Sequence, residues 1–270
     1  MSFSAEQAGQ RAENSEWLDY AVRMGLVAYG VVHLMIAWLA IQLAVGGGGA
    51  SANQKGALAE LARQPFGKVL VWAIAIGMFL LVVWRALEAA FGHHERDNAD
   101  RRKKQVASAA KGVVYAVLGI TALKTATGAS GASGGSNAMT AKVMNWPGGQ
   151  VIVVVVGLAI IGYGGYMAYR GWSGKYAEHL DSEGRSGDTG KTYLMFGKVG
   201  YLAKGFSIAV VGGLFVYAGI SHDPKRSGGL DQALHEVLRQ PYGVVLLIAI
   251  GLGLGCYGLF CLARARHLSR

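Results

Sequence analysis

Long apolar runs constrain the fold of this chain more than any other feature. Runs such as "VIVVVVGLAII" from Val151 and "VVLLIAIGLGLGCYGLF" from Val244 lack the alternation of membrane-crossing strands. About 20 apolar residues in a helix cross a hydrocarbon core about 30 Å thick, with every backbone hydrogen bond satisfied internally. Because 52% of the residues are hydrophobic and only 16% are charged, we predict an all-α, polytopic membrane protein.

Six segments are long enough to cross. The third is the most polar, since it contains Lys111 and Lys124. A removable signal peptide ending at "GASA" is an alternative for the first, but its leader is acidic and its apolar run is too long for that class. The predicted segments are Tyr20–Val45, Phe66–Phe91, Val106–Ala126, Gln150–Arg170, Lys198–Ile220 and Tyr242–Ala263.

The basic residues predict the orientation. Most of the 26 Lys and Arg residues fall on the side that holds the N-terminus, the loops near 93–105 and 177–195, and the tail. Positively charged loops stay in the cytoplasm, so we expect both termini there. The net charge of +10 then reflects topology and attraction to lipid headgroups. Arg101–Lys104 could instead be read as a nucleic-acid patch, but no aromatic residues interleave with it, and we expect no nucleic-acid partner.

One sequence pattern occurs three times. The motifs "AYGVVH", "AKGVVY" and "AKGFSI" begin at Ala28, Ala110 and Ala203, and "RQPFG", "NWPGG" and "RQPYG" follow at nearly constant distances. Each copy then has a glycine that precedes an aromatic residue by the same interval. Three copies of a two-helix unit explain this pattern. The repeated structural residues are Gly30, Gly112, Gly205, Pro65, Pro147, Pro241, Gly77, Gly162 and Gly253.

The repeats define the predicted organisation. Each has two crossings, so all three share one orientation, and we predict a pseudo-threefold bundle around an axis along the membrane normal. Small residues allow helices in lipid to approach closely. Gly251 and Gly255 are spaced for such contact, and Gly157, Gly162, Gly164 and Gly165 leave one helix smooth. The predicted parts are a leader (1–19), repeat one (20–92), a basic linker (93–105), repeat two (106–176), a polar linker (177–195) and repeat three (196–270).

The outer loops carry a second prediction. "GALAELARQ" and "QALHEVLRQ" place Leu58 with Leu61, and Leu234 with Val237, on one helical face. We therefore expect short amphipathic helices here, with "NAMTAKVMN" as a weaker counterpart in repeat two. The prolines that follow are expected in the first turns of the returning helices, where their missing N–H groups have no partner.

The combination of "A-[YK]-G-V-V-[HY]", "R-Q-P-[FY]-G-x-V-L" and "G-x-x-x-x-x-x-W-R" resembles a bacterial membrane family, the domain of unknown function 1206. The similarity extends from about Tyr20 through the rest of the chain. Repeat two has "NWPGG" for "RQPFG", and repeat three has Phe260-Cys261 where the pattern has Trp-Arg. The resemblance implies three two-helix repeats in the bacterial cytoplasmic membrane, and it implies no reaction, ligand or catalytic residue.

Motifs that carry chemistry are scarce. The sequence has no Walker loop, no zinc-ligand spacing and no nucleophile elbow, so we expect no enzyme activity, cofactor or metal. Cys256 and Cys261 lie five apart on one predicted helix, which favours packing roles over a disulfide. His93 and His94, with acidic neighbours, could hold a metal, but adjacent histidines in a charged loop are more often solvated.

Polar residues at membrane depth form the candidate site, a cavity lined by His33, Lys111, Tyr115 and Lys204. His33, Tyr115 and Ile208 occupy one repeat position, and Tyr29, Lys111 and Lys204 occupy another. Ionisable groups in a membrane often mark a pathway or pocket. The alternative is structural, since both lysines can extend to the interface and a buried histidine can bond a backbone carbonyl.

Two functions remain. The first is a non-catalytic accessory or scaffold that contacts membrane lipids and docks onto a larger membrane assembly or onto copies of itself. The second is a small transporter or channel around an axial cavity. The scarcity of acidic groups within the helices favours the first, because little is available to bind or relay an ion.

Overall fold

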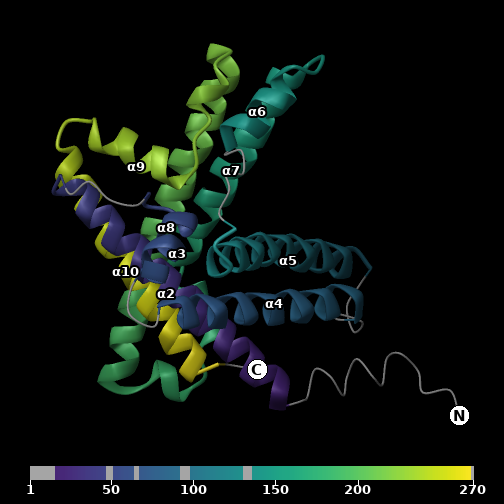
Figure 1. The fold of residues 1–270 in the computed structure, drawn as a ribbon. Coiled ribbons are helices and arrows are strands. Elements are labelled where there is room, and N and C mark those ends of the chain that lie inside the picture. The colour runs from purple at the N-terminus through teal and green to yellow at the C-terminus, as the bar shows by residue number, and fades with distance from the viewer. Residues whose placement is uncertain (1–15, 47–50, 64–66, 92–97, 130–135, 269–270) are drawn as a thin grey trace, which may run out of the picture. The chain divides into compact units, whose positions relative to one another are not determined.

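The computed structural model of the chain describes residues 16–46, 51–63, 67–91, 98–129 and 136–268. Within these ranges the regular secondary structure is helical, with turns and loops between the helices and one isolated bridge between Leu180 and Leu268. The prediction of an all-α fold is therefore confirmed for the described residues. The helices (Figure 1) are α2 (Glu16–Ala44), α3 (Gln54–Arg63), α4 (Gly67–Phe91), α5 (Asn98–Ala126), α6 (Ser136–Met144), α7 (Gly149–Trp172), α8 (Gly187–Ser221), α9 (Leu230–Leu238), α10 (Gly243–Arg266) and the 3₁₀ turns η1 (Lys175–His179), η2 (Glu183–Arg185) and η3 (Pro224–Arg226).

Five helices in the described part of the chain are long and apolar enough to cross a membrane. They are Val22–Ala44 in α2, Gly67–Ala86 in α4, and the whole of α7, α8 and α10. Several apolar helices of this length are those of a multi-pass membrane protein. The predicted third segment lies within α5, which is not one of these five helices.

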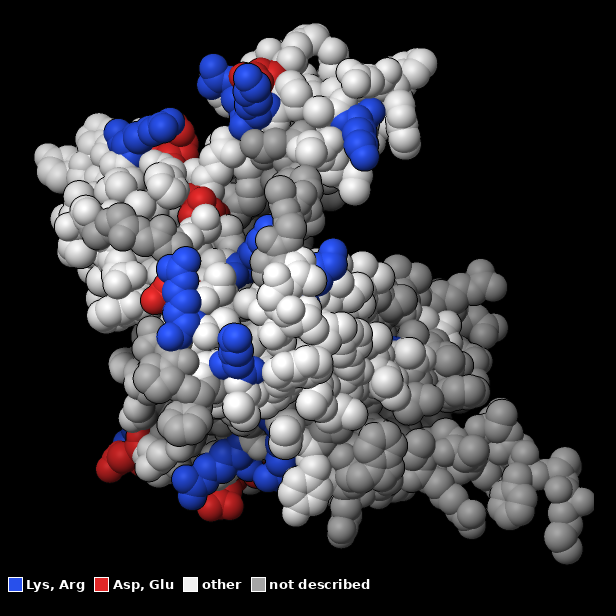
Figure 2. All heavy atoms as spheres, in the orientation of Figure 1, with Lys and Arg blue, Asp and Glu red and all other residues white. Residues whose placement is uncertain are grey.

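The described surface is largely uncharged on the face shown in Figure 2, where Lys, Arg, Asp and Glu side chains gather in small groups. Helix α7 shows why, since its side chains facing away from α8 are apolar or aromatic. A helix that exposes such side chains is suited to lipid rather than water. The exposed residues on α7 include Val151, Val155, Leu158, Tyr163 and Tyr166.

The chain divides into two compact units, and each is described by itself. The first contains residues up to Tyr29 and from Leu61 to Ala129, and the second contains Gly30–Glu60 and the chain from Ser130 onward. Helix α2 therefore contributes its first half to one unit and its second half to the other. These units do not follow the repeat boundaries expected from the sequence motifs.

In the first unit, α4 and α5 lie side by side (Figure 1). A Cβ added to Gly119 of α5 would lie 3.4 Å from the Cβ of Met78 on α4. Gly112 similarly faces the Cβ of Arg85, also at 3.4 Å. Glycines on α5 thus form the surface on which larger α4 side chains rest.

In the second unit, glycines on both helices bring α7 and α8 together. A Cβ on Gly157 would lie 2.8 Å from the carbonyl oxygen of Gly212, and one on Gly164 would lie 2.6 Å from that of Gly205. Gly157 and Gly164 are two helical turns apart, as are Gly205 and Gly212, so each pair occupies one face. The two backbones are therefore in direct contact along an antiparallel helix pair.

The second half of α2 packs against α10 in the same manner. A Cβ on Gly30 would lie 2.9 Å from the carbonyl oxygen of Gly258, and one on Gly251 would lie 3.2 Å from that of Ala37. Gly255 makes an ordinary contact with the Ala37 side chain. The expectation that Gly251 and Gly255 serve close helix contact agrees with this geometry.

The contact between the two helices of one repeat recurs in repeats one and three. A Cβ on Gly77 would lie 3.5 Å from the Cβ of Ala28, and one on Gly253 would collide with the Cβ of Ala203. Ala28 and Ala203 hold the same motif position. In repeat two, no atom of the described residues lies within 4 Å of a Cβ built on Gly162.

The short helices expected in the outer loops are present as α3, α6 and α9. Leu58 of α3 and Leu234 of α9 are each 1% exposed, as expected for the apolar faces of amphipathic helices. Helix α3 is preceded by Asn53, whose side-chain oxygen accepts a hydrogen bond from the Gly56 N–H at 2.9 Å. This cap satisfies one of the unpaired N–H groups at the helix start.

A tight turn joins α6 to α7. The Gly149 N–H donates to the carbonyl of Trp146 at 2.9 Å, and Gly148 has φ 72°. Proline in the second position and a left-handed residue in the third define a type II β-turn. Pro147 therefore lies in this turn, before the N-cap Gly148, and not in the first helical turn as predicted.

The same turn joins α9 to α10, where the Gly243 N–H donates to the carbonyl of Gln240 at 2.8 Å. Tyr242 holds the left-handed position with φ 61°, although its side chain is 84% exposed. A non-glycine residue in this conformation is strained. Pro241 precedes the N-cap, as Pro147 does, while Pro65 lies outside the described residues.

The glycine that ends each turn is required by contact with the preceding short helix. In each of the three repeats, a Cβ added to this glycine would collide with a backbone carbonyl of the preceding short helix. The repeated "P-x-G" therefore encodes the corner between a short outer helix and the returning helix. The glycines are Gly67, Gly149 and Gly243, and the carbonyls are those of Leu61, Val143 and Leu238.

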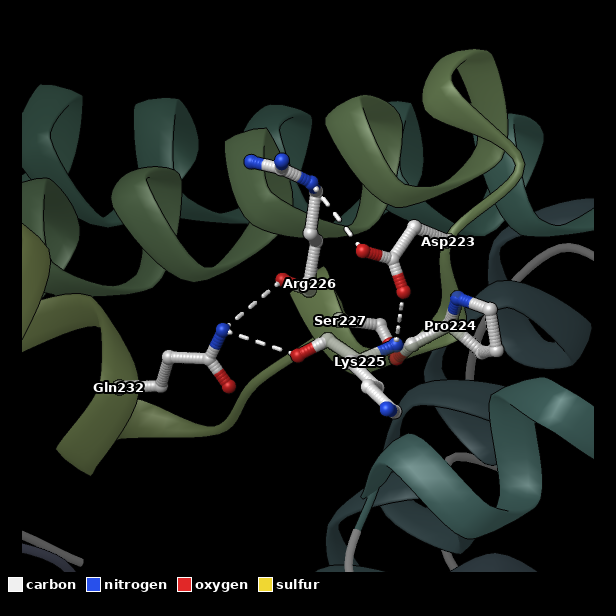
Figure 3. Close-up of polar contacts among 6 residues, drawn as sticks. All are labelled: Asp223, Pro224, Lys225, Arg226, Ser227 and Gln232. Carbon is white, nitrogen blue, oxygen red and sulfur yellow. Dashed lines mark hydrogen bonds and ion pairs between the residues drawn. The ribbon is translucent and has the colours of Figure 1, made fainter.

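Hydrogen bonds order the loop between α8 and α9 (Figure 3). The Asp223 carboxylate accepts from the Lys225 N–H at 3.0 Å and pairs with Arg226 at 3.3 Å. The Gln232 amide donates to the carbonyls of Lys225 and Arg226, and the fully buried Ser227 hydroxyl donates to that of Pro224. Helix α9 is thereby held to the end of α8.

Candidate functional site

Two of the four residues predicted to line a cavity meet at one tyrosine of the second unit. The ammonium of Lys204 on α8 lies 3.9 Å from the centroid of the Tyr257 ring on α10. The imidazole of His33 on α2 lies 4.9 Å from the same ring, centroid to centroid. His33 is 3% exposed. Three helices thus bring a cation, a phenol ring and an imidazole together.

The Tyr257 ring continues into a larger aromatic cluster. Tyr201 of α8 lies edge to face with Tyr257 at 5.3 Å and with Phe260 at 5.9 Å. Its other neighbour is Tyr176 of η1, whose ring stacks on it at 5.6 Å. Such offset and edge-to-face pairs are favourable beyond the apolar area that they bury.

Glycines on α8 make room for this cluster. A Cβ on Gly200 would lie 2.5 Å from the Tyr257 backbone, and one on Gly197 would collide with the Tyr176 ring. Any larger residue at these positions would push α10 or η1 away from α8. The aromatic cluster therefore depends on backbone approach as much as on the rings themselves.

Tyr176 also has a polar role. Its hydroxyl donates to the Leu194 carbonyl at 2.7 Å, which ties η1 to α8. Burial raises the pKa of the Tyr176 phenol, because the charged phenolate would lose its hydration. The neutral, hydrogen-bonding form is thus favoured in the folded chain.

Arg170 extends the cluster at the end of α7. Its guanidinium lies 5.6 Å from the Tyr201 ring centroid, and its Nη2 lies 2.7 Å from the His179 Nε2. The same nitrogen donates to the Lys175 carbonyl at 3.3 Å. Arg170 thereby fixes the turn that leads into η1.

The other two predicted cavity residues, Lys111 and Tyr115, belong to the first unit. The Tyr115 ring lies edge to face with Tyr29, at 6.0 Å and 87°. The Lys111 side chain is exposed. The structure therefore pairs His33 with Lys204 through Tyr257 and Tyr115 with Tyr29, each pair within its own unit.

These two clusters obey one repeat relation. Tyr29 and Lys204 hold the same motif position, and Tyr115 and His33 hold the other. In the first cluster, Tyr29 of repeat one lies beside Tyr115 of repeat two. In the second, Lys204 of repeat three and His33 of repeat one are neighbours of the same ring. In the second cluster the approach is through the ring of Tyr257.

The sequence motifs did not single out Tyr257, Tyr201 or Tyr176. A weak signal was present, since Tyr201 and Lys204 are three residues apart and share a face of α8. Tyr257 and Phe260 have the same spacing on α10. Both patterns also occur in ordinary helix cores, so they did not indicate a polar partner.

Among the residues that the structure describes, no three His, Cys, Asp or Glu side chains are grouped so that they could hold a metal ion. His93 and His94, considered as ligands, lie outside the described residues. Cys256 and Cys261 are both free thiols.

Long apolar helices, glycine-mediated contacts and a threefold sequence pattern define a class of multi-pass helical membrane proteins built from repeats. The chain belongs to the family described as Domain of Unknown Function (DUF1206), which matches residues 24–92, 106–174 and 199–267. The resemblance noted from the motifs is thus confirmed, with three tandem repeats. The chain is also similar to a Bacillus subtilis (strain 168) protein named "Uncharacterized protein YxxB", with 25% identity over 255 residues, 94% of this chain and 92% of that protein. No solved structure matches the chain.

Proposed function

We propose that the protein is a non-catalytic accessory or scaffold subunit of the bacterial cytoplasmic membrane. One observation carries the proposal, namely that the polar side chains of the candidate site are directed at aromatic rings of the same chain. Lys204 and His33 face Tyr257, and Arg170 faces Tyr201. A substrate would have to displace these contacts, whereas the apolar faces of the helices are open to neighbours.

The architecture that goes with this role is a bundle of six membrane helices, three two-helix repeats around a pseudo-threefold axis. Three contacts support it. Repeats one and two meet where α4 lies against α5. Repeats two and three meet where α7 lies against α8. Repeats three and one meet where α10 lies against α2.

A further contact links repeats three and one. The Ala52 N–H, just before α3, donates to the Asp231 carboxylate at the start of α9, at 2.7 Å. Ala52 is 1% exposed. The outer ends of the first and last repeats are therefore linked by a part-buried hydrogen bond.

The proposed topology has both termini in the cytoplasm, and single cysteines test it. In a chain with Cys256 and Cys261 replaced by alanine, Ser186→Cys and Ser221→Cys place thiols at exposed ends of α8. A membrane-impermeant maleimide applied to intact cells should label Ser221→Cys and spare Ser186→Cys. The reverse labelling would invert the topology.

The accessory role is tested by photo-crosslinking in living cells. A photoreactive residue at Leu158, 55% exposed on α7, should capture a reproducible protein neighbour, which is either a larger assembly or a second copy. The matched control is Val153 on the same helix, which is 4% exposed and should capture none. If neither site yields a protein neighbour, and the chain extracted in mild detergent is bare by native mass spectrometry, the accessory role is wrong.

A small transporter or channel is the second candidate, favoured by the convergence of His33 and Lys204 on one ring. The three groups come from different helices, as in sites at the interface between repeats. Flux of protons and small ions into proteoliposomes tests it. Flux that His33→Gln and Lys204→Met both abolish would support transport, and the absence of flux in the wild-type chain would exclude it for those ions.

A further inference from the structure

Two lysines, Lys175 of η1 and Lys198 of α8, lie against aromatic rings at the end of α7. The Lys198 ammonium lies 5.4 Å from the centroid of the Trp172 ring, and the Lys175 ammonium lies 5.2 Å from that of Tyr169. Both rings are exposed, Trp172 at 75% and Tyr169 at 54%. Each ammonium is therefore held over a ring face that is itself open to the surroundings.

Neither lysine has a carboxylate partner among the residues that the structure describes, although other basic side chains there do. Lys191, on the same helix as Lys198, pairs with Asp188 at 3.0 Å. Arg226 pairs with Asp223 at 3.3 Å. An ammonium has three N–H donors, and a ring face satisfies its charge only in part, so Lys175 and Lys198 retain the capacity to bind an anion.

The local backbone places both lysines beside the last turn of α7, where Tyr169 and Trp172 are three residues apart. A Cβ on Gly171 would lie 3.0 Å from the Tyr201 side chain, so the end of α7 lies tightly against α8. This contact brings Lys198, one turn earlier on α8, alongside Trp172. On the other side, Arg170 holds the Lys175 carbonyl, which fixes the turn after α7.

The position of this group is that of a membrane-water boundary. Tyr169 and Trp172 occupy the last turn of an apolar helix that is long enough to cross a membrane, and polar residues follow at once. Amphipathic aromatic rings prefer the headgroup level of a bilayer. Basic sites between membrane helices on the cytoplasmic side bind anionic headgroups, and this end of α7 is on the side predicted to face the cytoplasm.

We propose that Lys175, Lys198, Tyr169 and Trp172 form a binding site for the phosphate of an anionic phospholipid. The two ammoniums bind the phosphate oxygens, and the rings lie beside the glycerol and the upper acyl chains. The acyl chains continue along the exposed apolar side of α7. The ligand is a lipid and not free phosphate, because a soluble anion gains nothing from two exposed rings. This site does not depend on the accessory role proposed above.

Lipid binding to the full chain tests the site. We would titrate phosphatidylglycerol against phosphatidylcholine in detergent and count retained lipids by native mass spectrometry. The wild-type chain should retain phosphatidylglycerol preferentially. The variant Lys175→Ala with Lys198→Ala should lose affinity by about five-fold per lysine, and Trp172→Leu should weaken retention while leaving the charge unchanged.

The matched control is Arg185→Ala with Lys191→Ala, which removes two exposed positive charges on the same side of the predicted membrane. It should retain phosphatidylglycerol as the wild type does. Equal losses in the two double variants would show only a general charge effect and overturn the site. Lack of preference in the wild type would overturn it as well.

Competition with inorganic phosphate distinguishes a site for a lipid phosphate from a site for free phosphate. Millimolar phosphate should leave bound phosphatidylglycerol in place, and displacement would identify a free-anion site instead. Thermal unfolding of each variant in detergent checks the fold, and we expect no change because all four substituted basic side chains are exposed. The crosslinking experiment on protein neighbours is a separate readout, so either proposal can fail alone.

Discussion

Gly164 of α7 and Gly205 of α8 lie so close that a Cβ added to either would be 2.6 Å from the carbonyl oxygen of the other. Both neighbours are backbone atoms, which cannot move aside as a side-chain end can. Gly205→Ala should therefore separate the helices and lower the free energy of unfolding by about 1–3 kcal/mol, the range for overpacking. Thermal unfolding in detergent measures the loss.

Gly213 provides the control, because it lies on the same helix and no atom of the other described helices lies within 4 Å of its Cβ position. Gly213→Ala should leave stability unchanged or raise it by about 0.5–1 kcal/mol, since alanine is the better helix former. If the two variants lose stability equally, the requirement at Gly205 is not steric.

Tyr242 is strained where its counterpart in repeat two is glycine. The left-handed conformation at φ 61° costs an L-residue roughly 1–2 kcal/mol. The Tyr242 side chain is 84% exposed, so few contacts within the chain are lost with it. Tyr242→Gly should raise the free energy of unfolding by up to about 1 kcal/mol, measured by thermal unfolding in detergent.

The companion variant Tyr242→Ala removes the ring but keeps the Cβ, and so keeps the strain. It should show no gain, and the reverse change Gly148→Ala in repeat two should reduce stability. If Tyr242→Gly and Tyr242→Ala change the free energy of unfolding equally, then the exposed ring, and not the left-handed backbone, lowers the stability of the wild type.

The sequence was sufficient to predict the helical class, the three repeats and the short outer helices, because each depends on local composition or on a repeated motif. Gly157 and Gly164 could also have been chosen over Gly162 as contact residues. Residues seven apart share a helix face, and Gly205 and Gly212 show the same spacing on the partner helix. The structure uses the first pair and leaves Gly162 exposed.

The candidate site was less predictable, because its central residue depends on the register of three helices. Nothing local to Tyr257 distinguishes it from a core tyrosine. It becomes the shared neighbour of His33 and Lys204 only when glycines set the distances between α2, α8 and α10. The turn at Pro241 was misplaced for a similar reason, since its geometry depends on the close approach of the Gly243 backbone to the short helix before it.

Tyr176 gives a dependence of stability on pH. Burial raises the pKa of its phenol above the unfolded value near 10, so the folded state retains the proton longer than the unfolded state. Stability is then independent of this group below about pH 10 and falls as the pH rises through the raised pKa. Unfolding midpoints measured at pH values from neutral to strongly alkaline should show this fall.

Tyr176→Phe removes both the titrating group and the hydrogen bond to Leu194. It should lower stability at neutral pH by about 0.5–1.5 kcal/mol and make the alkaline decline shallower. Tyr242→Phe, at an exposed tyrosine, should leave the decline as steep as in the wild type. An unchanged slope in Tyr176→Phe would assign the alkaline loss to other groups.

Lys204 and Tyr257 should be energetically coupled, because the ammonium of the half-buried lysine lies 3.9 Å from the centroid of the buried Tyr257 ring. A double-mutant cycle of Lys204→Met and Tyr257→Leu isolates this pair. We expect a coupling energy of about 1–2 kcal/mol, as for a partly desolvated cation over an aromatic face.

Tyr257→Phe keeps the ring and should preserve most of the coupling with Lys204. If Tyr257→Phe abolishes the coupling as completely as Tyr257→Leu does, the hydroxyl and not the ring holds the lysine. In that case the site presents a polar group at membrane depth, and transport rather than packing becomes the better account of why the lysine lies there.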